Sequence, residues 1–212
     1  MAGRFLDIAS TPSVVAAQVA NGSRKLWERF SSDPASDRLT QDEADFIAAR
    51  DSFYIASVSE TGWPYVQHRG GPAGFLKVLD DSTLGFADFR GNRQYISLGN
   101  VAVDGRVALI LMDYPNRARL KILARMRVHD LGQEPELAER LATPDYRGRP
   151  ERAFVLQIEA FDWNCAQHII PRFTAGEIET ATTPLRLRLA ALEAENQTLR
   201  EQVAGVKQEQ GL

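Results

Sequence analysis

The sequence of 212 residues contains a single cysteine, Cys165, and only three histidines. One cysteine can form neither a disulfide within the chain nor a cysteine-based metal cluster. His68, His129 and His168 are scattered along the chain, and none stands at helical metal-ligand spacing from an acidic residue. We therefore predict no metal site, and we expect Cys165 to be a small buried residue rather than a nucleophile.

Long apolar runs and a strong charge of either sign are also missing. The longest apolar segments, such as residues 107–112, are far shorter than the roughly 20 residues of a membrane-spanning helix. The net charge of −3 creates no basic field that would attract nucleic acid or an anionic membrane. Asp7 interrupts the apolar stretch near the N-terminus, which argues against a secretion signal. A cytoplasmic protein without nucleic-acid or membrane partners is expected.

The middle of the chain has the pattern of β-structure. Segments rich in β-branched and aromatic residues alternate with turn signals, and no long helices separate them, so a doubly wound parallel sheet is disfavoured. The predicted strands are residues 52–60, 65–69, 75–80, 83–89, 106–114, 118–130 and 152–163. About six antiparallel strands with short turns predict a mainly β (α+β) fold, as a closed or partly closed barrel. An open α+β sheet is the alternative.

Helices are predicted before this region and after the sixth strand. Residues 13–31 have a helical pattern that Asn21 and Gly22 weaken, and residues 134–142 form a short helix. Thr40 and Glu43 form a capping box, which predicts a helix that runs to about Arg50. Residues 1–50 are therefore expected to be N-terminal helices that pack on the barrel.

The tail, residues 183–212, has a different pattern. Thr183 and Pro184 are typical of a helix start, with proline at the first helical position. Apolar residues then recur every seventh position in two sets, Leu185, Leu192, Leu199 and Val206 at d, and Leu189, Asn196 and Val203 at a. A single asparagine at a favours a two-stranded coiled coil in fixed register.

The charges beside this seam agree with a parallel pair. Position g of one helix meets the following e of the other, which places Arg188 near Glu193 and Glu195 near Arg200. We predict a dimeric coiled coil. The alternative is an amphipathic helix that lies on its own domain, since about three heptads make a short coiled coil.

Two arginines in the segment 62–100 mark a candidate anion site. Arg69 ends a predicted strand, and Arg93 lies in the first turn of a helix predicted to begin at Gly91, Asn92 and Arg93. Helix starts carry free N–H groups and a partial positive charge, so a nearby arginine favours phosphate binding. The glycine-rich stretch 70–74 lacks the lysine and hydroxyl of a P-loop, and it either contributes to the site or turns a hairpin.

Five segments occur in an order that resembles a known family. They are PYVQHRGGPAGFLKVLD, FADFRGNRQYISLGN, RVALILMDY, RLKILARMRVHD and FDWNCAQHIIPRF. The chain resembles the pyridoxamine 5′-phosphate oxidase-like, FMN-binding split-barrel proteins, over roughly residues 46–173. The resemblance implies a six-stranded antiparallel split β-barrel over residues 51–175, a homodimer, and FMN sites at the subunit interface.

The resemblance also implies which residues bind FMN. Arg69 and Arg93 match the phosphate-contacting positions, with Asn92 and Gln94 beside the second. Gln67 and His68 match the strand along the flavin ring edge. A C-terminal segment that reaches the flavin of the partner chain corresponds to Trp163, Gln167 and Arg172. The segment NCAQHIIPRF does not carry the oxidase's substrate-phosphate motif, so oxidation of pyridoxamine phosphate itself is not implied.

The function that this resemblance implies is a flavin-dependent oxidoreductase that transfers hydride to or from an unidentified small substrate. The flavin would supply the chemistry, so no side chain has to act as the acid or base. One alternative is a protein that binds flavin, deazaflavin or haem without turnover. A second alternative is a dimerisation module in which the coiled coil performs the biological role.

Overall fold

The structure is a computed structural model that describes residues 3–28, 38–163 and 166–209. The chain divides into two compact units, Met1–Ile169 and Ile170–Leu212. Cys165 lies outside the described residues, so its predicted burial is not addressed. Among the described helices, none is both long enough and apolar enough to cross a bilayer.

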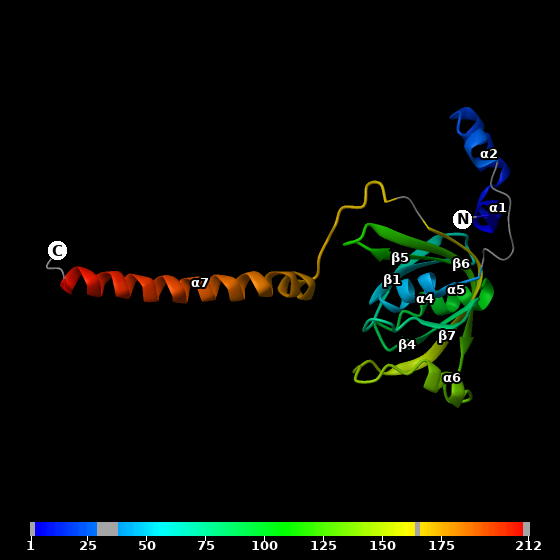
Figure 1. The fold of residues 1–212 in the computed structure, drawn as a ribbon. Helices are drawn as coiled ribbons and strands as arrows, with labels where there is room; N and C mark the ends of the chain where they lie inside the picture. Colours follow the sequence, from blue (N-terminus) through cyan, green and yellow to red (C-terminus); the bar gives the residue numbers. More distant parts are fainter. Residues whose placement is uncertain (1–2, 29–37, 164–165, 210–212) are drawn as a thin grey trace. The chain divides into compact units, whose positions relative to one another are not determined.

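The first unit is built on a mainly antiparallel sheet of seven strands (Figure 1). All seven predicted segments form strands, and the mainly β fold class with flanking helices is confirmed. The strands are β1 (Ser52–Val58), β2 (Pro64–Gly70), β3 (Lys77–Asp80), β4 (Thr83–Phe89), β5 (Arg106–Asp113), β6 (Ala118–His129) and β7 (Pro150–Trp163). Their order across the sheet is β2-β1-β5-β6-β7-β4-β3. The count exceeds the implied six by one.

One apolar cluster fills the space on the inner side of this sheet. Phe53 of β1, Phe86 of β4 and Phe154 of β7 are almost fully buried, and their rings contact one another in sequence at 5.3 and 5.4 Å. The sequence of β6 predicts that Leu120, Ile122, Ala124, Met126 and Val128 face the core, and the first four are buried, whereas Val128 is 41% exposed. The alternation follows from the pleat, which directs successive side chains to opposite faces.

Six helices accompany the sheet in the described part of the first unit. They are α1 (Gly3–Ala9), α2 (Pro12–Ala20), α3 (Arg24–Trp27), α4 (Gln41–Ala48), α5 (Ile96–Val103) and α6 (Pro135–Arg140). The break predicted at Asn21 and Gly22 is confirmed, since α2 ends there and Gly22 has a φ of 69°. The capping box is confirmed as well, with the Thr40 backbone donating to the Glu43 carboxylate at 2.9 Å.

The glycine-rich stretch after β2 turns the chain. Gly74 has a φ of 76°, in the left-handed region that favours glycine. A Cβ added to Gly71 would lie 2.8 Å from the ring of Phe75, which is buried in the core. These glycines therefore allow a tight turn against Phe75.

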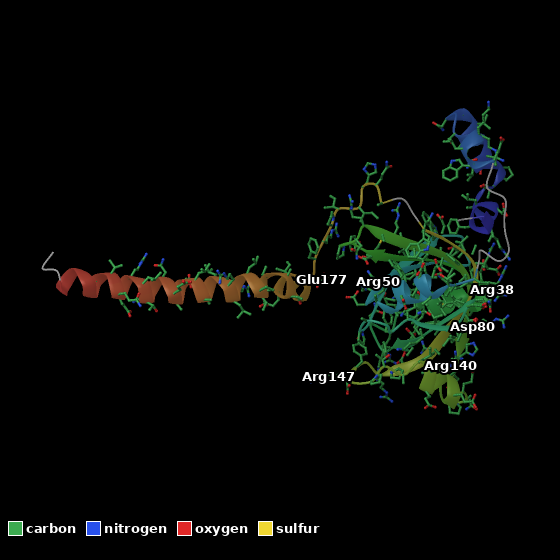
Figure 2. All side chains as sticks on the ribbon, viewed as in Figure 1. Arg38, Arg50, Asp80, Arg140, Arg147 and Glu177 are labelled. Carbon is green, nitrogen blue, oxygen red and sulfur yellow. The ribbon has the colours of Figure 1, made fainter. Side chains whose placement is uncertain are left out.

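The second unit is dominated by helix α7 (Ala175–Glu209). The helix start predicted at Thr183 and Pro184 is wrong, because Pro184 lies inside the helix. The actual start is a capping box in which the Thr174 backbone donates to the Glu177 carboxylate at 2.7 Å and the Glu177 backbone donates to the Thr174 hydroxyl at 3.2 Å. Glu177 is labelled at this start in Figure 2. The sequence carries this Thr-x-x-Glu signal, which the proline obscured.

Candidate functional site

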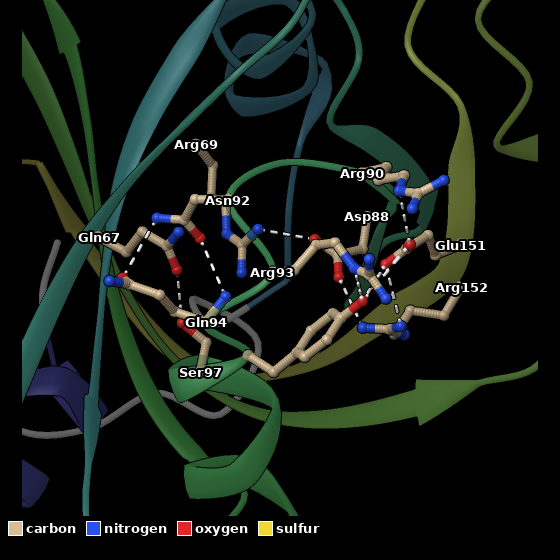
Figure 3. Close-up of polar contacts among 11 residues, drawn as sticks. Gln67, Arg69, Asp88, Arg90, Asn92, Arg93, Gln94, Ser97, Glu151 and Arg152 are labelled. Carbon is tan, nitrogen blue, oxygen red and sulfur yellow. Dashed lines mark hydrogen bonds and ion pairs between the residues drawn. The ribbon is translucent and has the colours of Figure 1, made fainter.

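A polar cleft of about 200 Å³ lies between strand β2, the end of β4 and the segment that leads into α5. Alternation along β2 points Tyr65, Gln67 and Arg69 into the cleft. The opposite wall is formed by residues 91–98, and Asp88, Phe89 and Glu151 complete the lining. Figure 3 shows the polar contacts among these side chains.

Arg69 is the most deeply placed cation of this cleft. Its Nη1 donates to Asp88 at 2.7 Å, and its guanidinium lies 5.6 Å from the ring centre of Phe154. Its Nε is buried and has no hydrogen-bond partner in the described structure. A buried donor without an acceptor is costly, and such a group at a cleft indicates a place for an anionic ligand atom.

A network of charges surrounds Arg69. Asp88 also accepts from Arg152 at 3.3 Å, and Arg152 donates to Glu151 at 3.2 Å. Arg90 lies 3.8 Å from the same Glu151 carboxylate. Burial raises the pKa of the Asp88 carboxyl above its usual value, although Arg69 and Arg152 oppose this effect. With Arg93 included, four guanidinium groups face two carboxylates, which gives the cleft and its surroundings a net charge of +2.

The segment from Gly91 to Tyr95 has an unusual backbone. Arg93 and Tyr95 have φ angles of 62° and 53°, a conformation that L-residues other than glycine adopt rarely and at a cost of about 1 kcal/mol or more. The helix start predicted at Gly91–Arg93 is therefore wrong, and α5 begins at Ile96. The wall of the cleft includes Ile96, Ser97 and Leu98, whose N–H groups lie in the first helical turn and have no acceptor within the helix.

Side-chain hydrogen bonds hold these unusual residues in place. The Tyr95 hydroxyl donates to Glu151 at 3.1 Å, and the Arg152 guanidinium lies 4.9 Å from the Tyr95 ring centre. The Arg93 Nε in turn donates to the Tyr95 hydroxyl at 3.4 Å, and Arg93 is otherwise exposed to solvent. Tyr95 thus links the exposed arginine to the buried charge network.

Two further hydrogen bonds fix α5 against the sheet. The buried Ser97 hydroxyl donates to the Gln67 side-chain carbonyl at 2.8 Å, and Asn100 donates to Ser57 on β1 at 3.0 Å. The Gln67 side chain lines the cleft, and its amide oxygen accepts this bond.

Five of the nine predicted cofactor residues line this single cleft. They are Gln67, Arg69, Asn92, Arg93 and Gln94. His68 does not, because it follows Gln67 on the strand and is exposed on the opposite face, where its ring lies 5.5 Å from Tyr54. In one chain Gln67 and His68 therefore cannot contact the same ligand.

The three predicted C-terminal residues are placed differently. Trp163 packs edge-on against Phe46 at 4.7 Å and donates from Nε1 to Glu43 at 2.7 Å, away from the cleft of its own chain. Gln167 is exposed, and Arg172 belongs to the second unit. Contacts of these residues with the cofactor of a partner chain remain a prediction. Lys121 lies on the outer face, where it pairs with Asp162 at 2.7 Å.

Sequence reasoning missed Asp88, Tyr95, Ser97, Glu151 and Arg152. Asp88 and Arg152 lie directly opposite each other in the pairing of β4 with β7. A charged residue within each apolar strand was visible in FADF and RAFVL, but only the strand register shows that the two charges meet. Among the described residues, no cluster of three histidine, cysteine or acidic side chains could hold a metal ion.

The chain is similar in sequence to one protein family and in fold to several solved structures. Residues 39–163 match the family model described as "Pyridoxamine 5′-phosphate oxidase". Solved structures of similar fold include HupZ of Group A Streptococcus (17% identity, TM-score 0.49, 64% of this chain and 99% of that one). An FMN-binding protein of Syntrophomonas wolfei (14%, 0.44, 69% and 97%) and an F420 reductase (17%, 0.39, 55% and 93%) are also similar. No curated protein matches the sequence.

Proposed function

The chain belongs to the pyridoxamine 5′-phosphate oxidase family, and from this premise we propose that it is an FMN-binding protein whose cleft between β2 and α5 holds the phosphate end of the cofactor. The FMN phosphate carries close to two negative charges near neutral pH. The cleft and its surroundings have a net charge of +2, so a bound phosphate would neutralise them.

The observation that carries this proposal is the buried Nε of Arg69, a charged donor at the cleft without an acceptor. A phosphate oxygen would supply that acceptor while Nη1 keeps its bond to Asp88. Arg93, exposed at the mouth, and the first N–H groups of α5 would contribute further donors. The residues present therefore fit an anionic cofactor of this kind.

A second copy of the chain would complete the site. Pockets that enclose a drug-sized ligand usually measure roughly 300–1,000 Å³, and this cleft of about 200 Å³ is smaller. It has room for the phosphate end, whereas the flat flavin ring needs additional walls. A homodimer with the ring at the subunit interface would provide them, and Trp163, Gln167 and Arg172 are the predicted contributions from the partner.

The surface that would form this homodimer is the outer face of β1, β2, β5 and β6. Apolar side chains including Tyr54, Val66, Ile110 and Leu123 line a cleft there, and Val66 is 61% exposed. Since side chains alternate along β2, Val66 lies on this outer face and Gln67 and Arg69 lie in the cofactor cleft, and β2 is an edge strand of the sheet. A partner on the outer face would therefore lie close to the mouth of the cleft.

The reaction that we propose is hydride transfer between a small substrate and the bound cofactor, in a flavin-dependent oxidoreductase. The flavin ring would supply the redox chemistry when bound. The residues of this chain would bind and orient: Arg69 and Arg93 hold the phosphate, the Gln67 amide donates to the polar edge of the ring, and Tyr65 provides an aromatic wall. None of them needs to transfer a proton.

The test is an absorption spectrum of the purified protein, with mass identification of whatever heating releases. Flavin absorption and released FMN would support the proposal, and bleaching by a reduced nicotinamide without oxygen would support the enzyme over a carrier. A Soret band would indicate haem instead. A protein that neither carries FMN nor takes it up after purification would contradict the proposal.

A further inference from the structure

Helix α7 exposes a continuous apolar stripe. Ile178, Leu185, Leu192 and Leu199 follow one another at intervals of seven residues, Leu189 lies among them, and Val203 follows Leu199 by one turn. Their exposed fractions range from 43% to 70%. An apolar stripe on a long helix normally packs against another element, since packing of that face supplies most of the stability of a helix.

We propose that this stripe pairs with the same stripe of a second copy of the chain, in a parallel, in-register, two-stranded coiled coil. The proposal does not depend on flavin binding. The helix begins at Ala175, so the seam extends to Ile178 at position d, one heptad earlier than a start at Thr183 would allow. The described seam then covers nearly four heptads, from Ile178 to Val203.

Pro184 is compatible with this seam because of its position in the heptad. It immediately precedes Leu185 at d and therefore occupies position c, on the side of the helix that faces solvent. The missing proline N–H leaves the carbonyl of Thr180 without its helical donor. Thr180 lies at position f, also outside the seam, where water can satisfy the free carbonyl. The proline therefore does not interrupt the apolar contact.

Asn196 at position a indicates the direction of pairing. In a parallel pair a residue at a faces the same residue of the partner, so the two Asn196 amides would hydrogen-bond to each other. In an antiparallel pair position a faces position d, and the d residues of this helix are isoleucine, leucine and valine. Asn196 would then face an apolar side chain in every antiparallel register, which leaves a buried amide unsatisfied.

Charges beside the seam favour a second copy as the occupant. In the parallel register Arg188 at g lies near Glu193 at e of the partner, and Glu195 at g lies near Arg200 at e. Both contacts are attractive and both occur twice in a symmetric pair. Within one helix, Arg186 pairs instead with Glu179 one heptad earlier, at 2.8 Å. Parallel pairing would also bring both first units to the same end of the coiled coil, as a shared interface requires.

Disulfide cross-linking of the full chain tests this arrangement. Leu199→Cys places a thiol at position d, where the two copies meet, and Leu187→Cys is the matched control at position f on the outside. Each variant is oxidised mildly, and the linked peptides are identified by mass so that natural Cys165 can be kept. We expect a 199–199 linkage in most of the protein and at least tenfold less 187–187 linkage, since disulfides need Cα atoms within about 7 Å.

Three cross-linking results would overturn the proposal. Equal linkage at both positions would indicate random collisions, and no linkage at 199 would indicate that the helix pairs with something else or packs on its own chain. A mixture of Leu189→Cys and Leu199→Cys chains that links 189 to 199 in preference to 199–199 would indicate antiparallel pairing. Thermal unfolding of Asn196→Val provides a second readout: a more stable tail supports burial of this position in a seam, since a polar residue at a costs stability, whereas an equally stable or less stable tail contradicts it.

Discussion

Arg69 donates to Asp88 through Nη1 at 2.7 Å, while the buried Nε of the same guanidinium has no hydrogen-bond partner. Asp88 therefore holds one side of the guanidinium, while the buried Nε donor is left without an acceptor. An unsatisfied buried donor costs about 1–3 kcal/mol, and a ligand that supplies an acceptor recovers that cost on binding. The proposed phosphate would supply such an acceptor, and Asp88 would compete with it for Arg69.

Asp88→Asn should increase the affinity for FMN. The change removes a carboxylate that repels the phosphate and competes for Arg69, while the asparagine carbonyl can still accept from the arginine. We expect binding that is roughly threefold to tenfold tighter, as for loss of one partly screened repulsive charge. Titration of flavin fluorescence checks this, and weaker binding by the variant would contradict the role of Asp88 as a competitor.

Asp88→Asn also tests how the stability of the protein depends on pH. Because the folded-state pKa of Asp88 is raised above the ordinary value of 3.8, its contribution to stability is fully present below pH 3.8 and is lost as the pH rises through the folded value. The unfolding free energy of the natural protein, relative to Asp88→Asn, should therefore fall as the pH rises from 3.8. Denaturant unfolding of both proteins across this range measures the difference in unfolding free energy. If the natural protein gained stability relative to Asp88→Asn as the pH rose, the prediction would be wrong.

Arg93→Ala should weaken FMN binding without changing the fold. Arg93 lies exposed at the mouth of the cleft, and its only described hydrogen bond goes to the Tyr95 hydroxyl at 3.4 Å. Loss of a charge-assisted contact to phosphate would reduce affinity by roughly tenfold. Arg106→Ala is the matched control, because Arg106 is an exposed arginine paired with Asp104 outside the cleft. Equal FMN affinity of Arg93→Ala and Arg106→Ala would show that Arg93 does not bind the phosphate.

The strands and the capping box at Thr40 were predictable from sequence because their signals are local. Alternation along 118–130 and turn residues between strands define the sheet, and Thr40 and Glu43 contact each other three residues apart. The start of α5 was not predictable, because nothing in Gly91–Tyr95 indicates that two residues other than glycine adopt positive φ. In that conformation the Tyr95 hydroxyl donates to Glu151, which is distant in sequence and close only after β7 pairs with β4.

In the predicted site, too, the positions set by neighbouring residues were predictable from the sequence, whereas contacts between distant segments were not. Gln67 and Arg69 lie together in the cleft because they share one face of β2, and that same alternation places His68 on the other face. The resemblance to a family indicated which residues would bind the cofactor, but it did not indicate the direction in which their side chains point. Contacts made across the sheet, such as Asp88 with Arg152, need the register of the strands before they can be expected.

Glu43→Gln should destabilise the protein at neutral pH and not in acid. Burial works against ionisation of Glu43, but hydrogen bonds from Thr40 and Trp163 outweigh it, so the pKa is lowered from 4.5. The stabilisation is therefore present above pH 4.5 and is lost as the pH falls through the folded value. We expect a loss of about 1–2 kcal/mol in unfolding free energy at pH 7.

Asp42→Asn is the control for this prediction, because Asp42 is an exposed acid in the same helical turn. At pH 7, Asp42→Asn should lower the unfolding free energy by less than Glu43→Gln does. If the difference between Glu43→Gln and the natural protein were the same at pH 3 as at pH 7, the ionised Glu43 would not be the stabilising group.

Val66→Glu should weaken flavin binding by disrupting the proposed contact between the two first units, while the proposed coiled coil keeps the two chains paired. A glutamate at this outer position places a charge in an apolar contact surface. Val19→Glu is the control, because Val19 on α2 is exposed to almost the same extent, 62% against 61%. Flavin titration should show weaker binding for the first variant and unchanged binding for the second. Unchanged flavin binding by Val66→Glu would show that a partner on this face does not contribute to the flavin site.

The most direct test of the account compares FMN with riboflavin, which lacks the phosphate, in the natural protein and in Arg69→Lys. The lysine keeps a positive charge beside Asp88 but removes the guanidinium fork and its Nε donor. We predict that the natural protein binds FMN on the order of 100-fold more tightly than riboflavin, and that Arg69→Lys weakens FMN binding by roughly tenfold while leaving riboflavin nearly unchanged. Equal affinity of the natural protein for the two flavins, or an equal loss of both in the variant, would contradict a phosphate site at Arg69.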